Sequence, residues 1–194
     1  KALAHLDLEY NGICDEGSGR LAAVLGGCSA LAYLNLADNE IGDKGAGSLA
    51  GALGECKAFA HLNLDGNGIS DEGAGKLAEL LVDSKALAHL SLGNNEIGAH
   101  GAGSIAGVLL ECKALAHLNL RSSEIGIEGA SRLAEVLEKC TVLTLLDLSG
   151  NKIGDEGTRR VAGSLGECNA LAHLALGGNQ IGDEGAGSLA GVFW

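Results

Sequence analysis

The sequence predicts an α/β solenoid, in which seven copies of a strand–helix unit stack into one parallel sheet that is covered on one side by helices. Two observations support this prediction. The hexapeptide KALAHL at 1–6 returns at 85–90 and 113–118, and variants of it stand at 29–34, 57–62, 141–146 and 169–174, always with a period of 28 residues. Within each unit the hydrophobic period changes once, from that of a strand to that of a helix. One strand and one helix cannot bury both of their faces alone, so neighbouring units must stack.

The second unit illustrates the change of period. Leu34 and Leu36 alternate with polar neighbours, which predicts a short strand with one buried face. Ala46, Leu49, Ala50 and Leu53 then follow helical spacing and form one apolar stripe, and Asp43 is the expected N-cap of that helix. We expect a single domain over 1–194 with repeats 1–28, 29–56, 57–84, 85–112, 113–140, 141–168 and 169–194.

The corner between strand and helix contains a false calcium motif. In unit three the stretch DGNGISDEG follows Asn63, so that Asn63, Asp65 and Asn67 stand at alternate positions, as in an EF-hand loop. The bidentate glutamate of such a loop is missing, because Ala74 occupies its position. An asparagine recurs at the third of these positions in six of the seven units, which indicates that its amide satisfies backbone groups at the turn. Ser123 replaces it in unit five, where we expect weaker local order.

The pattern L-x-x-L-x-L-x-x-N-x-I resembles the leucine-rich repeat, and unit two shows it in full. The length of 28 residues and the helical second half are similar to the ribonuclease-inhibitor type, which also occurs in NOD-like receptors and in activators of the Ran GTPase. The resemblance covers the whole chain. It implies a curved horseshoe whose parallel sheet lines the concave face, whose helices line the convex face, and whose concave face binds other proteins.

Glycines and cysteines both have structural interpretations. The segment GAGSLAG at 45–51 superficially resembles a dinucleotide-binding turn, but it does not follow its strand directly and its glycines recur at 101–107 and 185–191. We interpret its small residues as permitting close approach of helices.

Five of the six cysteines share one repeat position after the helix, and we expect them to be reduced, buried thiols. No zinc-type pair of cysteines and no converging catalytic set is present, so neither an enzyme nor a cofactor is expected.

Histidines form the most distinctive column. His5, His61, His89, His117 and His173 share one strand position, and Tyr33 and Leu145 complete the column. Strand alternation places this column on the concave face, with neighbouring rings about 4.8 Å apart. Three interpretations remain open: a residue that is merely tolerated in a duplicated unit, a pH-sensitive or partner-binding surface, or a site for a divalent metal.

Partner specificity in a solenoid is expected where the units differ on the concave face. Arg121 is the only cation there, and tyrosines are the aromatic anchors. Ile127 replaces a capping aspartate and leaves an apolar residue exposed. The expected partner-binding residues are Tyr10, Tyr33, Asn35, His61, Asn63, Asp65, His89, Ser91, His117, Asn119, Arg121 and Asp147.

Composition narrows the class of partner. A net charge of −12 disfavours nucleic acid and anionic membranes, and no apolar run is long enough to insert into a bilayer. With no recognisable signal peptide and with reduced cysteines, we expect an intracellular protein. The preferred function is a non-enzymatic scaffold or recognition domain for a protein partner. One alternative is a structural subunit or segment packed in a larger assembly through its convex face and its bare ends, which include Leu3, Phe193 and Trp194. The others are an engineered consensus array and a GTPase-activator-like regulator.

Overall fold

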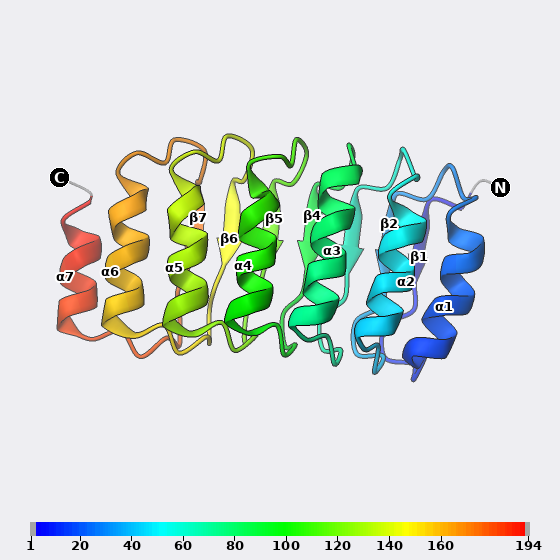
Figure 1. The fold of residues 1–194 in the computed structure, drawn as a ribbon, viewed down its shortest axis with the longest axis horizontal. Coiled ribbons are helices and arrows are strands. Elements are labelled where there is room, and N and C mark those ends of the chain that lie inside the picture. Colours follow the sequence, from blue (N-terminus) through cyan, green and yellow to red (C-terminus); the bar gives the residue numbers. More distant parts are fainter. Residues whose placement is uncertain (1–2, 193–194) are drawn as a thin grey trace.

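The computed structural model describes residues 3–192 as a single row of strand–helix units (Figure 1). The strands are three residues long and the helices have eight to thirteen residues. The elements are, in chain order, β1 (His5–Asp7), α1 (Cys14–Leu25), β2 (Tyr33–Asn35), α2 (Asp43–Leu53), β3 (His61–Asn63), α3 (Asp71–Asp83), β4 (His89–Ser91), α4 (Gly98–Leu109), β5 (His117–Asn119), α5 (Gly126–Leu137), β6 (Leu145–Asp147), α6 (Gly154–Leu165), β7 (His173–Ala175) and α7 (Asp183–Ala190).

All seven strands form one parallel sheet in the order β1 to β7, so each strand pairs with the strands of the adjacent units. The register follows the repeat without slippage: Leu62 pairs with Leu90, and His61 pairs with His89. Figure 1 shows the helices as one layer lying against the sheet, with the N- and C-terminal units at opposite ends of the row. The predicted α/β solenoid is therefore confirmed.

The core lies between the sheet and the helix layer. Leu34 and Leu36 of unit two are fully buried, as are Ala46, Leu49 and Leu53 of its helix. The equivalent residues of units three, four and five belong to the same continuous cluster. The strand alternation and the helical stripe read from the sequence are both confirmed by this burial.

Buried asparagines connect neighbouring units beyond the ends of five of the seven strands, namely Asn39, Asn67, Asn95, Asn151 and Asn179. The Oδ1 atom of Asn67 accepts hydrogen bonds from the backbone N–H groups of Asn39 (3.2 Å) and Ile41 (2.9 Å) in the preceding unit. Its Nδ2 atom donates to the carbonyls of Leu36 and Leu64, both at 3.0 Å. The amide thus satisfies donors and acceptors of two units at once, which explains the asparagine column without any metal.

The serine in this column keeps only part of the pattern. Ser123 is fully buried, and its hydroxyl donates to the carbonyls of Leu92 (3.0 Å) and Arg121 (3.1 Å). A hydroxyl is too short to accept from the preceding unit, and the backbone N–H groups of Asn95 and Ile97 have no acceptor among the described residues. The weaker local order expected at this unit stays a prediction.

Helix capping crosses from one unit to the next. The prediction that Asp43 is the N-cap of its own helix is wrong, because Gly42 occupies that position and Asp43 is the first helical residue. The carboxylate of Asp43 instead accepts hydrogen bonds from the N–H groups of Ser70 (2.8 Å) and Gly73 (3.0 Å), which open α3. A carboxylate at a helix N-terminus stabilises the exposed N–H groups and the helix dipole. Asp43 therefore supports the neighbouring helix, which a sequence reading within one unit cannot reveal.

Small residues allow the helices to approach one another. A Cβ atom on Gly101 of α4 would lie 2.9 Å from the Cβ of Ala74 and 3.0 Å from the Cα of Asp71 in α3. Only glycine fits such a backbone approach. The interpretation of these glycines as packing residues is therefore supported at Gly101.

The cysteines are all reduced in the structure. Cys56, Cys112 and Cys140 of the inner units are buried, as expected. Cys28 and Cys168, which lie nearer the two ends, are only half-buried. Burial of Cys112, followed by the nearby Cys140 and Glu111, raises the pKa of its thiol to about 11.

The two ends of the row are less well covered than its centre. Leu3 in the first unit is 51% exposed, and a cavity of about 600 Å³ in the last unit is lined by leucines that include Leu171 and Leu189. Phe193 and Trp194, which were expected at this end, lie outside the described residues. No helix within residues 3–192 combines the length and the apolar character needed to cross a bilayer.

Candidate protein-binding surface

A ladder of aromatic rings runs along the sheet face that lies away from the helices; we call this the open face. The ladder comprises His5, Tyr33, His61, His89 and His117, one residue from each of five adjacent strands. Ring centroids are 4.0 Å apart for His5 and Tyr33 and 4.8 Å apart for His61 and His89, and both pairs are stacked. The histidine column expected from the sequence is therefore a continuous strip of contacting rings.

The ladder changes its geometry at its last step. His117 meets His89 edge to face, with centroids 4.2 Å apart and an interplanar angle of 84°. The next residue in the column is Leu145, which interrupts the rings before His173. Edge-to-face and offset contacts both suit the quadrupoles of aromatic rings. Because the rings stack on one another, their edges and nitrogen atoms are the parts that remain for a partner.

Crowding favours the neutral imidazoles. Partial burial lowers the pKa of His61, and the neighbouring His89, His117 and His5 lower it further by charge repulsion. Burial also lowers the pKa of His89, with a second contribution from His117. Both shifts favour the neutral imidazole at the centre of the ladder, where a neutral ring offers an apolar face and polar nitrogen atoms.

The ladder lacks the geometry of a metal site. Among residues 3–192 no group of three or more histidine, cysteine or carboxylate side chains is arranged to hold an ion. The histidines stack along a line, whereas zinc requires ligands that converge on a point. The calcium-like side chains also have other partners, since Asn67 is buried in the asparagine ladder and Asp65 bonds to Gly93.

Polar side chains lie beside the ladder, but not all of them are available. Asn35 is 4% exposed, and its amide donates to the carboxylate of Glu9 at 2.9 Å. This residue was expected to contact a partner, and its burial removes it from the surface. Asn63 and Asp147 remain half-buried beside the ladder, and each accepts a hydrogen bond from a backbone N–H two residues ahead.

Asp65 is the centre of a network that spans three strands. Its Oδ1 accepts from the N–H of Gly93 at 2.6 Å, and its Oδ2 accepts from Nδ2 of Asn119 at 3.3 Å. Asn119 also donates to the hydroxyl of Ser91 at 2.8 Å. Burial is the main cause that raises the pKa of Asp65, and hydrogen bonds from Ser91 and Gly93 oppose it. The network holds Asp65, Ser91 and Asn119 in fixed positions, so they form a rigid part of the open face.

Tyr10 and Arg121 lie beyond the strand ends. Tyr10 is 84% exposed and adopts a positive φ of 60°. It lines a cavity of about 380 Å³ together with Asp38 and Glu40, two carboxylates that were not among the residues expected to bind a partner. Arg121 is exposed, and no carboxylate of the described residues lies within ion-pair distance of its side chain.

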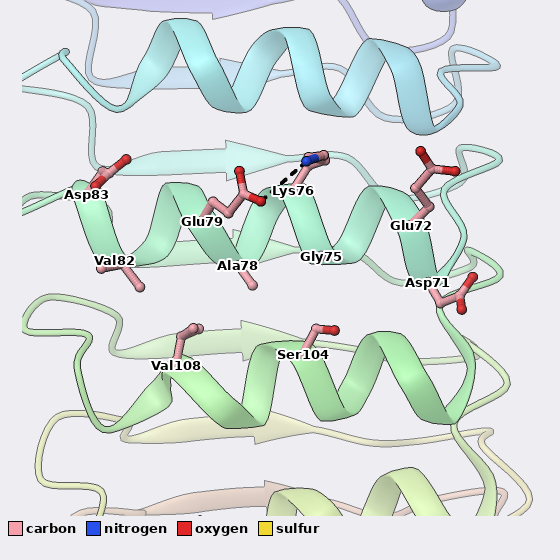
Figure 2. A pocket seen from close by; sticks show the side chains of 10 residues that line it. All are labelled: Asp71, Glu72, Gly75, Lys76, Ala78, Glu79, Val82, Asp83, Ser104 and Val108. Carbon is pink, nitrogen blue, oxygen red and sulfur yellow. Dashed lines mark hydrogen bonds and ion pairs between the residues drawn. The ribbon is translucent and has the colours of Figure 1, made fainter.

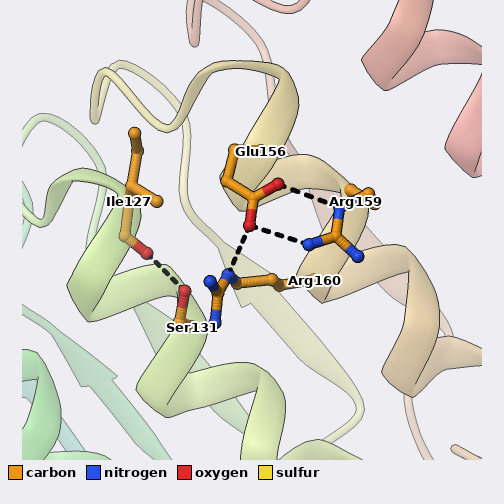
Figure 3. Close-up of polar contacts among 5 residues, drawn as sticks. All are labelled: Ile127, Ser131, Glu156, Arg159 and Arg160. Carbon is orange, nitrogen blue, oxygen red and sulfur yellow. Dashed lines mark hydrogen bonds and ion pairs between the residues drawn. The ribbon is translucent and has the colours of Figure 1, made fainter.

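The helical face carries a different chemistry. Figure 3 shows Glu156 of α6 between Arg159 and Arg160, which donate to it at 2.8 Å and 2.9 Å respectively. Hydrogen bonds from Arg159 and then Arg160 lower the pKa of Glu156 to about 2. Ile127 lies nearby on α5 and is 46% exposed, as expected. Its carbonyl accepts a hydrogen bond from Ser131 at 2.7 Å.

Comparison with known proteins supports the same architecture. A family model described as "Leucine Rich repeat" matches residues 27–50, 59–78, 139–161 and 167–190. No curated protein matches the chain in sequence.

Among solved structures, actin-binding site 2 of leiomodin-1 is 22% identical, with a TM-score of 0.61 over 70% of this chain and 79% of that one. The tropomodulin C-terminal domain of Caenorhabditis elegans is 17% identical, with a TM-score of 0.60 over 71% of this chain and 83% of that one. An internalin of Listeria monocytogenes is 24% identical, with a TM-score of 0.54 over 89% of this chain and 48% of that one.

The parallel sheet with one open face, the helix layer and the asparagine ladder define a solenoid repeat protein of the α/β class. The segments that match the family model are leucine-rich repeats, and they lie within this architecture. At these identities the structural likeness shows the fold alone.

Proposed function

We propose that the chain is a non-enzymatic recognition domain, and that its open face, the predicted concave face, binds a protein partner. The aromatic ladder is the observation that carries this proposal. Tyr33, His61, His89 and His117 are half-buried, so their ring edges offer both apolar surface and hydrogen-bonding nitrogen atoms. Tyrosine is enriched among the residues that dominate binding energy at interfaces, and each histidine adds a ring with a polar edge to the same strip.

The rest of the open face supports a specific contact. Ser91, Asn119 and Asp65 are held by hydrogen bonds, so little conformational entropy is lost when a partner binds them. Arg121 supplies a cation that is free to pair with a carboxylate, and arginine is a frequent anchor of interfaces. Tyr10, with its exposed ring, extends the surface toward the cavity beyond β1.

The test compares two sets of four alanine substitutions. The first set replaces Tyr33, His61, His89 and Arg121 on the open face. The control set replaces four exposed residues away from it and leaves the net charge unchanged, namely Lys44, Glu55, Lys57 and Glu167. Partners are captured by crosslinking to the unaltered chain, purified, and measured by titration against both variants.

We expect the open-face set to weaken binding of the purified partner by at least about a hundredfold, and the control set to change it by less than about threefold. Equal affinity of the partner for both variants would refute the open face as the binding surface. Actin is one defined protein to include in the titration, because the leiomodin-1 neighbour is an actin-binding site.

A further inference from the structure

The hollows between successive helices differ in size. A groove between α3 and α4 has a volume of about 810 Å³, whereas two hollows along α5 and α6 have volumes of about 520 Å³ and 460 Å³. Units three to six, which form these hollows, all have 28 residues, so we attribute the difference to the side chains on their helices.

One repeat position contributes to the open space of the α3–α4 groove. In unit five this position is Arg132, whose side chain extends back over α4, so that a Cβ atom on Gly103 would lie 2.8 Å from its Cδ. In unit four the same position is Ser104, which is too short to extend over α3. No atom lies within 4 Å of where a Cβ of Gly75 would stand. Arg132 thus covers α4 at Gly103, whereas α3 at Gly75 is left uncovered by Ser104.

The walls of the groove carry three apolar side chains and one serine. Figure 2 shows Ala78 and Val82 of α3 pointing toward α4, and Ser104 and Val108 of α4 pointing toward α3. Val82 is 40% exposed. Leu110, at the same repeat position one unit further along, is 50% exposed. The corresponding residues of units one, two, five and six are glycine or glutamate, so exposed aliphatic side chains at this position are confined to units three and four among these six units.

The rim of the groove is acidic. Four carboxylates of α3 line the groove, and its only lysine, Lys76, is paired with Glu79 at 3.3 Å. Helix α4 adds no carboxylate. The carboxylates are Asp71, Glu72, Glu79 and Asp83, all of them exposed. In α6, by contrast, Glu156 is neutralised by two arginines (Figure 3).

We propose that the α3–α4 groove docks a basic amphipathic helix of a protein partner. The apolar side of that helix would lie on Val82 and Val108, and its lysines or arginines would face Asp71 at one end of the groove and Asp83 at the other. Insertion of an amphipathic helix into an apolar groove is a common mode of recognition. An excess of unpaired carboxylates selects a cationic partner and speeds its association. This site lies on the helical face, so it is independent of the open face.

The probe is a labelled synthetic helix of leucine and lysine, about 14 residues or four turns long, titrated at about 0.15 M salt and followed by fluorescence anisotropy. A helix with glutamate in place of lysine is the negative control. The groove variant Glu72→Lys with Asp83→Lys reverses two charges on the rim. The matched variant Glu55→Lys with Glu167→Lys alters two exposed carboxylates elsewhere and changes the net charge by the same amount.

We expect saturable binding of one lysine helix per chain, weakened about tenfold or more by the groove variant and less than about threefold by the matched variant. Substitution of the exposed Val82 by serine should also weaken binding, because the apolar contact is lost. The open-face alanine set should leave this binding unchanged. Equal loss in the two charge variants would show attraction to the net charge alone and overturn the proposal, as would the absence of saturation.

Discussion

Replacing Ser123 by asparagine should stabilise the protein, because this substitution completes the asparagine ladder. At present the N–H groups of Asn95 and Ile97 have no acceptor among the described residues. The Oδ1 of an asparagine at position 123 would accept from both, as Asn67 accepts from Asn39 and Ile41 at 3.2 Å and 2.9 Å.

The size of the effect follows from the number of hydrogen bonds. Two added hydrogen bonds contribute about 0.5–1.5 kcal/mol each, so Ser123→Asn should raise the free energy of unfolding by about 1–3 kcal/mol. The reverse change, Asn67→Ser, leaves two buried donors unpaired and should lower it by about 2–6 kcal/mol. Ser104→Asn, on the exposed surface of α4, is the control and should change it by less than about 0.5 kcal/mol.

Urea unfolding measures the global effect, and amide hydrogen exchange measures the local one. In the Ser123→Asn protein, exchange at Asn95 and Ile97 should slow together with the rise in stability. A neutral or destabilising effect of Ser123→Asn, with exchange at these two amides unchanged, would refute the role given to the asparagine amide.

Three further predictions concern packing, reactivity and pH. Gly107→Ala should stabilise the protein by up to about 1 kcal/mol, since no atom lies within 4 Å of where the added Cβ would stand. Gly101→Ala should destabilise it, because the added Cβ would lie 3.0 Å from a Cα of α3. Equal melting temperatures of the two variants would contradict this. Cys14, which is exposed, should react with iodoacetamide far faster than Cys112, whose pKa of about 11 leaves little thiolate at pH 8. The two rates can be compared by mass spectrometry of partly labelled protein, and equal rates would contradict this prediction. The lowered pKa of His61 means that the folded state binds fewer protons than the unfolded state, so the free energy of unfolding should fall as the pH drops below about 6.5, the histidine pKa of the unfolded chain. His61→Phe should flatten this dependence between pH 7.5 and 5.5. An unchanged dependence of the unfolding free energy on pH, measured by urea titration, would count against it.

The fold could be predicted because the same strand–helix pattern recurs in all seven units, so seven copies support each inference. Leu34 and Leu36 could be assigned to the core from alternation alone, and the structure buries both. Capping could not be assigned, since Asp43 lies at the start of one helix in sequence but bonds to the start of the next in space. Contacts between units depend on the stacking distance, which no single unit encodes.

The candidate surface was predictable in part. The histidine column followed from strand alternation, and its rings do stack. Asn35 points to the same face of the sheet by strand alternation, yet Glu9 and the adjacent strands bury it. Strand alternation gives the face of the sheet toward which a side chain points. The length of the neighbouring side chains, which alternation does not give, decides how much of that side chain remains exposed. A signal for the α3–α4 groove was present in the sequence, because Val82 stands where units one, two and six have glycine. Ser104, which units two and seven share, stands where the other four units have a long cation, and both differences appear only when units are compared position by position.

The two proposed surfaces use opposite sides of one buried layer. Leu62 and Leu77 are fully buried and belong to the core that separates the aromatic ladder from the helical face. A substitution on the ladder therefore shares no contact with the groove, and effects at such separated sites add. One chain with both surfaces intact could hold a partner on each face at once, and the solenoid would then join two proteins. If the lysine helix and an open-face partner bind with the same affinities together as alone, the chain acts as a rigid connector; mutual exclusion would mean that the two faces are coupled through the core.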